Sequence, residues 1–230
     1  ISKDLIGYVS IANWSDSSVV PQLDEALEAM RGTRGLIVDV RLNGGGSEPL
    51  AAQVAGRFLA KEFAYSYSQF RNGSKHEELT EKTARKVSPR GPWRYDRPVV
   101  LLIGQKVMSS NESFIGMMLG DPDLTTMGDR TCGSSGNPKI VELPLGMTVS
   151  VPKWIDYRND GVALDERGFE PQVRYEAKPG AFEGQRDDLL TAALARRAKA
   201  DLPSKPIEAP AEPSKTEAVQ SSTASENTPK

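Results

Sequence analysis

One segment constrains the fold of this chain more than any other: a nearly continuous apolar run, then a glycine turn, then a helical pattern. The apolar run is Leu36–Val40, the glycines are residues 44–46, and a helix is expected from about Ser47 to Leu59. A continuous apolar run is typical of a strand buried on both faces, as in parallel sheets covered by helices. Strand, glycine turn and helix in this order form the βα unit of a parallel sheet. The sequence therefore predicts an α/β fold.

Strand and helix patterns alternate along the first 200 residues. Further strands are expected at residues 5–11, 98–103 and 123–127, and helices at 20–30, 109–119 and 187–199. Residues 140–155 alternate in hydropathy around a Leu145-Gly146 turn, which predicts a β-hairpin. Residues 61–97 mix charged and aromatic side chains, and we interpret them as a long, partly extended excursion over the surface.

The composition of the chain changes near residue 203. Residues 203–230 hold five of the 16 prolines, and Ile207 and Val219 are their only aliphatic side chains larger than Ala. Such a segment cannot bury enough apolar area to offset its chain entropy, so a disordered tail rich in Pro, Ala, Glu, Ser and Thr is expected. The sequence thus predicts one α/β domain over residues 1–202 and a tail over 203–230.

Composition also excludes several classes of function. The chain has 29 Lys and Arg against 31 Asp and Glu, so it lacks the basic surplus of a nucleic-acid binder. No stretch approaches 18 consecutive apolar residues, so no membrane-spanning helix is expected. A single cysteine, Cys132, excludes an internal disulfide, and a single histidine, His76, leaves few ligands for a zinc site. We therefore expect neither a metal nor another cofactor, and His76 lies in a charged stretch that does not favour a catalytic role.

Two turns at strand ends suit chemistry on an anion. The glycines at 44–46 free the backbone to direct N–H groups outward, beside a helix start that favours negative charge, although a tight turn alone also explains them. Ser109 stands at the start of the helix after the next buried strand, where the N–H of Ser110 could donate to an oxyanion. The spacing Ser109-x-x-Glu112 is equally the pattern of a capping box, which requires no catalysis.

Two later stretches are weaker candidates for a site. Residues 128–136 form a strip rich in glycine and hydroxyl side chains, which suits either a segment beside a site or a plain polar loop. Asp165 precedes a Gly and Pro turn at residues 168–171, where a carboxylate could orient a base or cap the turn.

Together these stretches resemble the catalytic domain of the tail-specific (C-terminal processing) and tricorn-core serine peptidases. The resemblance covers about residues 5–200 with a divergent middle. Its matching text is residues 6–9, the string Asp39-Val40-Arg41-Leu42-Asn43-Gly44-Gly45-Gly46 with the strand before it, residues 98–103, 109–114, 128–131 with Gly133, and 168–171. It implies a crotonase-like twisted sheet flanked by helices, with a β-hairpin region, and hydrolysis of peptide bonds.

The resemblance also implies roles for individual residues. Ser109 matches the nucleophile, the N–H groups of Gly46 and Ser110 match the oxyanion donors, and Asp165 matches the carboxylate of the tricorn-like tetrad. Supporting positions are Gly45, Glu112 and Ser134. The tail-specific branch has its lysine base where this chain has Ser134, so the resemblance points to a base from another segment. In the tricorn-like branch that base is a histidine on an upstream helical domain. We expect this domain, and a PDZ-like domain, to lie outside this chain.

Other functions stay open on the sequence alone. The main alternative is a non-catalytic, peptide-binding or scaffolding member of the same family, which the loss of the lysine at Ser134 favours. A third reading, an acyl-thioester enzyme of crotonase type, rests on analogy of fold only. The expected partner is a peptide or unfolded protein, assembly into a homo-oligomer is open, and the family favours a location outside the cytoplasm, in the bacterial periplasm, with the cytoplasm as the alternative.

Overall fold

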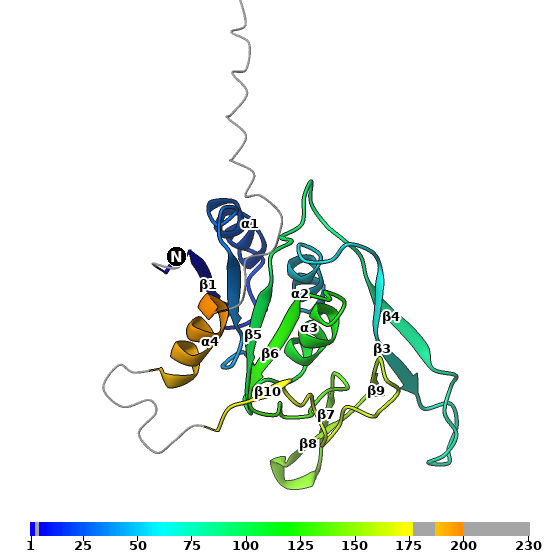
Figure 1. Cartoon of the computed structure of the whole chain (residues 1–230). Coiled ribbons are helices and arrows are strands. Elements are labelled where there is room, and N and C mark those ends of the chain that lie inside the picture. Colours follow the sequence, from blue (N-terminus) through cyan, green and yellow to red (C-terminus); the bar gives the residue numbers. More distant parts are fainter. Residues whose placement is uncertain (3–4, 177–186, 200–230) are drawn as a thin grey trace, which may run out of the picture.

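The structure is a computed structural model and describes residues 1–2, 5–176 and 187–199. Its centre is a five-stranded sheet in the order β1-β2-β5-β6-β10, in which every neighbouring pair of strands is parallel (Figure 1). Its strands are β1 (Ile6–Ser10), β2 (Gly35–Asp39), β5 (Val99–Ile103), β6 (Leu124–Gly128) and β10 (Val173–Arg174). Every residue of β2 and β5 is buried, as their apolar runs predict. The α/β class is thus confirmed.

Helices cover both faces of this sheet (Figure 1). They are α1 (Val19–Ala29), α2 (Glu48–Ala55), α3 (Ser110–Met118) and α4 (Asp188–Lys199). Side chains of β2 point alternately to the two faces, as strand geometry requires. Leu36 and Val38 pack with α1, α2 and α3, whereas Ile37 packs with Leu189 and Ala193 of α4. The helix expected from residue 47 to 59 already ends at Ala55, and the other helices lie where the sequence predicts them.

A second, antiparallel sheet corrects two sequence predictions. Its order is β4-β3-β9, from β3 (Phe63–Phe70), β4 (Thr83–Val87) and β9 (Trp154–Arg158). Residues 61–97 therefore include two paired strands rather than only a surface excursion. The predicted hairpin exists as β7 (Lys139–Glu142) and β8 (Thr148–Val151), joined by a 3₁₀ turn at Pro144–Gly146. However, its second arm stops at Val151, and residues 154–158 belong to the other sheet.

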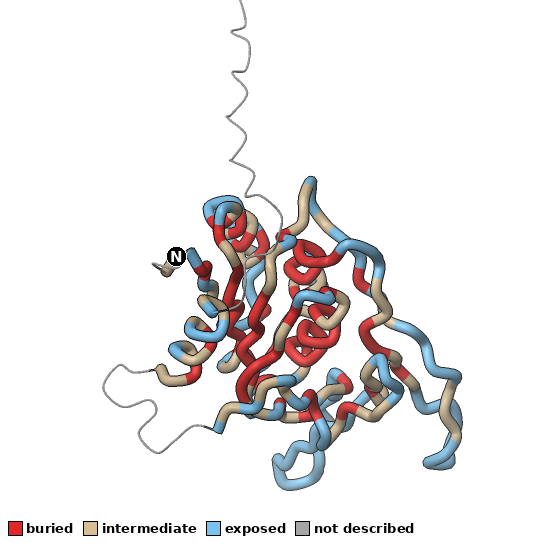
Figure 2. Tube along the Cα trace, viewed as in Figure 1, coloured by how far each residue is buried: buried red, intermediate tan, exposed pale blue. Residues whose placement is uncertain are grey.

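The core and the exposed parts of the molecule separate clearly (Figure 2). Buried residues concentrate in the central sheet and in α2 and α3, whereas the β7–β8 hairpin is mostly exposed. Within the described ranges, no helix is both long and apolar enough to cross a bilayer. The tail predicted at 203–230 lies outside the described residues, and the extent of the domain stays a prediction.

Helix α3 is unusual because all nine of its residues are buried, including four polar ones in its first turn. These are Ser110, Asn111, Glu112 and Ser113. Buried polar side chains need hydrogen-bond partners inside the protein, so their partners define what this helix start organises.

Candidate active site

The site lies at the carboxyl ends of β2 and β5. Ligands of parallel α/β sheets bind at this end of the strands. A Cβ on Gly45 would lie 2.9 Å from the Cβ and 3.3 Å from the Oγ of Ser109, so these residues are in direct contact. Gly45 and Gly46 have φ of +111° and +134°, and a Cβ on Gly46 would lie 2.7 Å from the backbone of Trp14. The structure thus brings Ser109 and the glycine turn into one corner.

Hydrogen bonds fix the backbone of the glycine turn from two sides. The N–H of Gly45 donates to Oδ1 of Asn43 at 2.8 Å, so it is not available to a ligand. The carbonyl of Gly45 accepts the N–H of Trp14 at 3.0 Å. The carbonyl of Gly46 accepts the hydroxyl of Ser110 at 2.6 Å, which binds the turn to the first residue of α3.

Ser109 itself has a strained backbone, with φ 56° and ψ −133°. A non-glycine residue in such a region costs on the order of 1–3 kcal/mol and persists only where its surroundings hold it. Here its N–H donates to the carbonyl of Ser134 at 2.7 Å. The side chain of Ser109 makes no capping hydrogen bond to α3. The capping-box prediction is therefore wrong, and the hydroxyl of Ser109 does not cap the start of α3.

Glu112 explains why the capping box does not form. Its side chain is fully buried, and its two oxygens accept the N–H groups of Gly133 at 2.8 Å and Ser134 at 2.9 Å, together with the hydroxyl of Thr131. Burial raises the pKa of Glu112, against the opposing effect of these three donors. Glu112 therefore holds residues 131–134 of this strip against α3, and the carbonyl of Ser134 accepts the N–H of Ser109.

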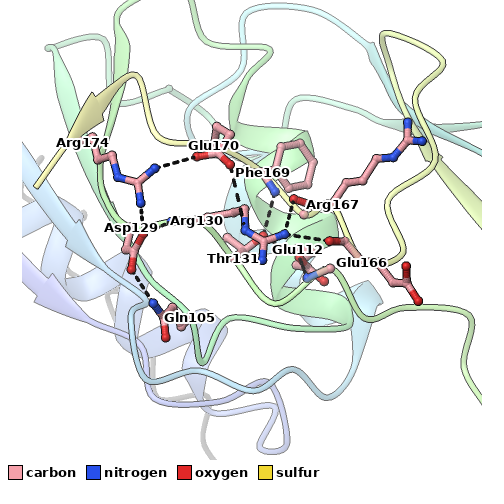
Figure 3. Close-up of polar contacts among 12 residues, drawn as sticks. Gln105, Glu112, Asp129, Arg130, Thr131, Glu166, Arg167, Phe169, Glu170 and Arg174 are labelled. Carbon is pink, nitrogen blue, oxygen red and sulfur yellow. Dashed lines mark hydrogen bonds and ion pairs between the residues drawn. The ribbon is translucent and has the colours of Figure 1, made fainter. Parts of the chain in front are cut away.

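Hydrogen bonds to other loops also hold the strip in place (Figure 3). Thr131 exchanges hydrogen bonds with Phe169, through its own N–H to the Phe169 carbonyl at 3.1 Å and from the Phe169 N–H to its hydroxyl at 2.8 Å. Arg130 donates to the carbonyl of Glu166 at 2.7 Å. Gln105 donates to Asp129 at 2.6 Å. The strip is therefore part of a defined structure and not a plain polar loop.

Asn111 is a site residue that the sequence analysis missed. It is fully buried, and its Nδ2 donates to the carbonyls of Val40 at 3.1 Å and Asn43 at 2.9 Å. Its Oδ1 accepts the indole N–H of Trp14 at 3.2 Å. Asn111 therefore joins α3, the end of β2 and the segment at Trp14. The available signal was a run of four polar residues at the start of a helix that follows a fully buried strand.

The remaining candidate residues differ in how they are placed relative to Ser109 and the glycine turn. Oδ1 of Asp165 accepts the N–H of Ser135 at 3.3 Å, so this carboxylate lies at the strip, one residue beyond Ser134. Ser134 is exposed and reaches Ser109 through its backbone carbonyl rather than through its side chain. His76 is exposed in the loop between β3 and β4.

The specific string Asp39-x-Arg41 has a structural role. Arg41 bridges two carboxylates, with its Nε 2.9 Å from Asp39 and its Nη1 3.0 Å from Asp187. Asp187 in turn accepts the N–H of Leu190 in the first turn of α4 at 2.9 Å. The hydrogen bonds from Arg41 hold the pKa of Asp187 below its ordinary value. This ion-pair group ties the end of β2, next to the glycine turn, to the helix on the opposite face.

Comparison with known proteins places this geometry in a family. The family model "Peptidase family S41" matches residues 5–175, and the chain belongs to that family. The chain is 27% identical over 175 residues to the carboxy-terminal processing protease CtpA of Bacillus subtilis, covering 74% of this chain and 35% of that protein. It is 25% identical over 202 residues to the carboxyl-terminal-processing protease of Synechocystis, covering 83% of this chain and 45% of that protein. The chain thus spans less than half the length of these relatives.

Solved structures agree with this assignment. A protein from Parabacteroides merdae, solved as a candidate peptidase, matches with a TM-score of 0.79 and 31% identity over 86% of this chain and 62% of that one. The tricorn protease matches in fold, with a TM-score of 0.59 and 20% identity over 84% of this chain and 18% of that one. The family named from the sequence motifs is confirmed.

Proposed function

We propose that this chain is the catalytic part of a serine peptidase that cleaves peptide bonds by acyl transfer. The observation that carries the proposal is the contact of Ser109 with the glycine turn, in a strained backbone geometry and with no capping role for its hydroxyl. A hydroxyl beside a helix start and a glycine turn suits a nucleophile next to backbone donors.

The reaction follows from these positions. Oγ of Ser109 attacks the carbonyl carbon of a peptide, and its proton passes to a base. The oxyanion that forms accepts hydrogen bonds from the N–H groups of Gly46 and Ser110, and the start of α3 favours its negative charge. Gly46 is preferred over Gly45 because the N–H of Gly45 is already bound to Asn43. The leaving amine takes up the proton, and water then hydrolyses the acyl-enzyme.

The base is proposed to come from a segment outside this chain, as in the tricorn-like branch. Ser134, which stands where the tail-specific branch has lysine, cannot accept a proton at neutral pH. Asp165 lies at the strip beside Ser109 and suits a carboxylate that orients an incoming base. We propose this positioning role for Asp165 because its side chain already binds the strip.

The substrate, fold type, location and assembly are proposed from the relatives and the family resemblance. Their names describe processing of carboxyl termini, and we propose a peptide or unfolded protein segment as the substrate here. We also propose a crotonase-like fold and a location outside the cytoplasm. Assembly into a homo-oligomer is proposed only by analogy with tricorn.

Covalent labelling tests the proposal. The full-length protein should react with a fluorophosphonate at Ser109 and hydrolyse a peptide library, and Ser109→Ala should abolish both. Ser74→Ala, which changes an exposed loop serine, is the matched control and should leave both unchanged. A protein that binds peptides but neither reacts nor hydrolyses would instead support the non-catalytic alternative, which Ser134 in place of lysine favours.

A further inference from the structure

A mostly buried arginine contacts residues on both sides of the corner that holds Ser109. Arg85 is on β4, in the divergent part of the chain, and only 17% of its side chain is exposed. Its guanidinium pairs with two carboxylates, with Asp156 at 2.9 Å and also with Glu48. It also lies over the ring of Tyr65, 5.3 Å from the ring centre. A planar guanidinium can bind two carboxylates in fixed geometry, which a lysine cannot do.

One of these carboxylates, Glu48, lies next to the glycine turn in the chain. Glu48 is the first residue of α2 and follows Gly46 by two positions. Its carboxylate also accepts hydrogen bonds from the hydroxyls of Tyr65 and, at 3.4 Å, of Ser113 on α3. Glu48 therefore joins the start of α2 to the helix that follows Ser109.

The other carboxylate, Asp156, binds the strip. Asp156 on β9 accepts the hydroxyl of Ser135 at 2.9 Å. Ser135 follows Ser134, whose carbonyl binds the N–H of Ser109. The chain of contacts Glu48–Arg85–Asp156 thus connects the two backbone segments that meet at Ser109.

Arg85 is the counter-charge on which this connection depends. Asp156 is 1% exposed, and among the described residues its Oδ1 and the hydroxyl of Ser66 have no partner. Both residues line a small pocket that Glu112 and Arg158 also line. The guanidinium of Arg158 is engaged by Asp160 and by the carbonyl of Gly168. Burial raises the pKa of Asp156, and Arg85 opposes this rise.

We infer that Arg85 is a positioning residue of the peptidase site, which holds the glycine turn and the Ser134–Ser135 strip in register with Ser109 without touching substrate. The inference rests on the proposed function. Removing Arg85 leaves the half-buried Glu48 and the buried Asp156 without their shared cation, and breaking one side of a buried pair is strongly destabilising to local structure. Displacement of a nucleophile or its donors by about 1 Å costs roughly 100-fold in rate.

The first test compares variants on one strand in the full-length protein. Arg85→Met should lower kcat for peptide hydrolysis about 100-fold with little change in KM. Arg85→Lys should recover part of this loss, because it restores the charge but not the two-sided geometry. Lys86→Met is the matched control, since Lys86 is the next residue on β4 and forms an exposed pair with Glu62. It should retain the parent's kcat.

A pH profile distinguishes a positioning role of Arg85 from a general loss of protein stability. In Arg85→Met the buried carboxylate of Asp156 loses its cation, so its ionised form is destabilised more than its protonated form. The ratio of variant to parent activity should therefore rise as the pH falls from 8 to 6. Adding Asp156→Asn to Arg85→Met should also raise kcat above that of Arg85→Met alone. A ratio independent of pH, with no gain in the double variant, would refute the inference.

Hydrogen exchange makes the inference independent of activity. The amide of Ser109, which donates to Ser134, should exchange at least tenfold faster in Arg85→Met than in the parent, while Lys86→Met leaves it protected. If the parent neither reacts with fluorophosphonate nor hydrolyses peptides, the proposed function fails, and this exchange still decides whether Arg85 positions the corner. Unchanged exchange and unchanged kcat in folded Arg85→Met would overturn the role of Arg85 alone.

Discussion

Asn111→Ala is the change that most directly tests how the corner is held together. The side chain of Asn111 makes three buried hydrogen bonds, to the carbonyls of Val40 and Asn43 and from the indole of Trp14. Truncation leaves these three polar groups without their partner in a site where Trp14 is fully buried. At about 1–1.5 kcal/mol for each lost bond, the free energy of unfolding should fall by about 3–5 kcal/mol.

Urea unfolding followed by circular dichroism measures this loss at one pH for parent and variant. Fluorophosphonate labelling of the folded variant, at low urea, should also slow at least tenfold, because the turn after β2 is no longer tied to α3. Asn72→Ala, which changes an exposed asparagine outside the site with no positive φ, is the control and should change the stability by less than about 0.5 kcal/mol. A loss below about 1 kcal/mol for Asn111→Ala would refute the view that this residue holds α3, the end of β2 and Trp14 together.

Three further changes have defined outcomes. Gly45→Ala places a Cβ 2.9 Å from Ser109 at φ +111° and should abolish labelling, whereas Gly32→Ala, with no atom within 4 Å of the added Cβ, should not; labelling rates at equal folded protein decide this. Ser109→Gly should raise the unfolding free energy by about 1 kcal/mol in urea melts while abolishing labelling, since glycine tolerates φ 56°; lower stability would contradict the strain. Burial raises the pKa of Asp121 from 3.8 to about 6, so its stability contribution should fall as pH rises through that window. Asp121→Asn should therefore stabilise the protein at pH 7 by about 2–3 kcal/mol and flatten the pH dependence of urea melts; an unchanged slope would count against the raised pKa.

Four of the five strands of the central sheet could be predicted because they carry their own signal, whereas the two-residue strand β10 was not predicted. β2 and β5 are buried on both faces, so every residue must be compatible with the core, and the apolar runs mark them directly. The second sheet gave no such signal. β3 turns Ser66 and Ser68 inward, where they are buried, so its sequence resembles a solvent-exposed segment.

The site was predictable in its outline and not in its contacts. The string of glycines and the position of Ser109 identify the corner, because both follow the carboxyl ends of neighbouring parallel strands. The spacing of Ser109 and Glu112 did not reveal that Glu112 turns toward the strip, since local spacing cannot show a partner about 20 residues away in the chain. Asn111 and Arg85 act through long-range contacts and were missed for the same reason.

The central claim is that Ser109 and the N–H groups of Gly46 and Ser110 form one oxyanion site. A crystal structure of the full-length protein after reaction with a fluorophosphonate measures this directly. The account predicts phosphorus bonded to Oγ of Ser109 and one phosphonyl oxygen within about 2.7–3.2 Å of both backbone nitrogens. A phosphonyl oxygen directed to solvent, or an adduct on another residue, would contradict it.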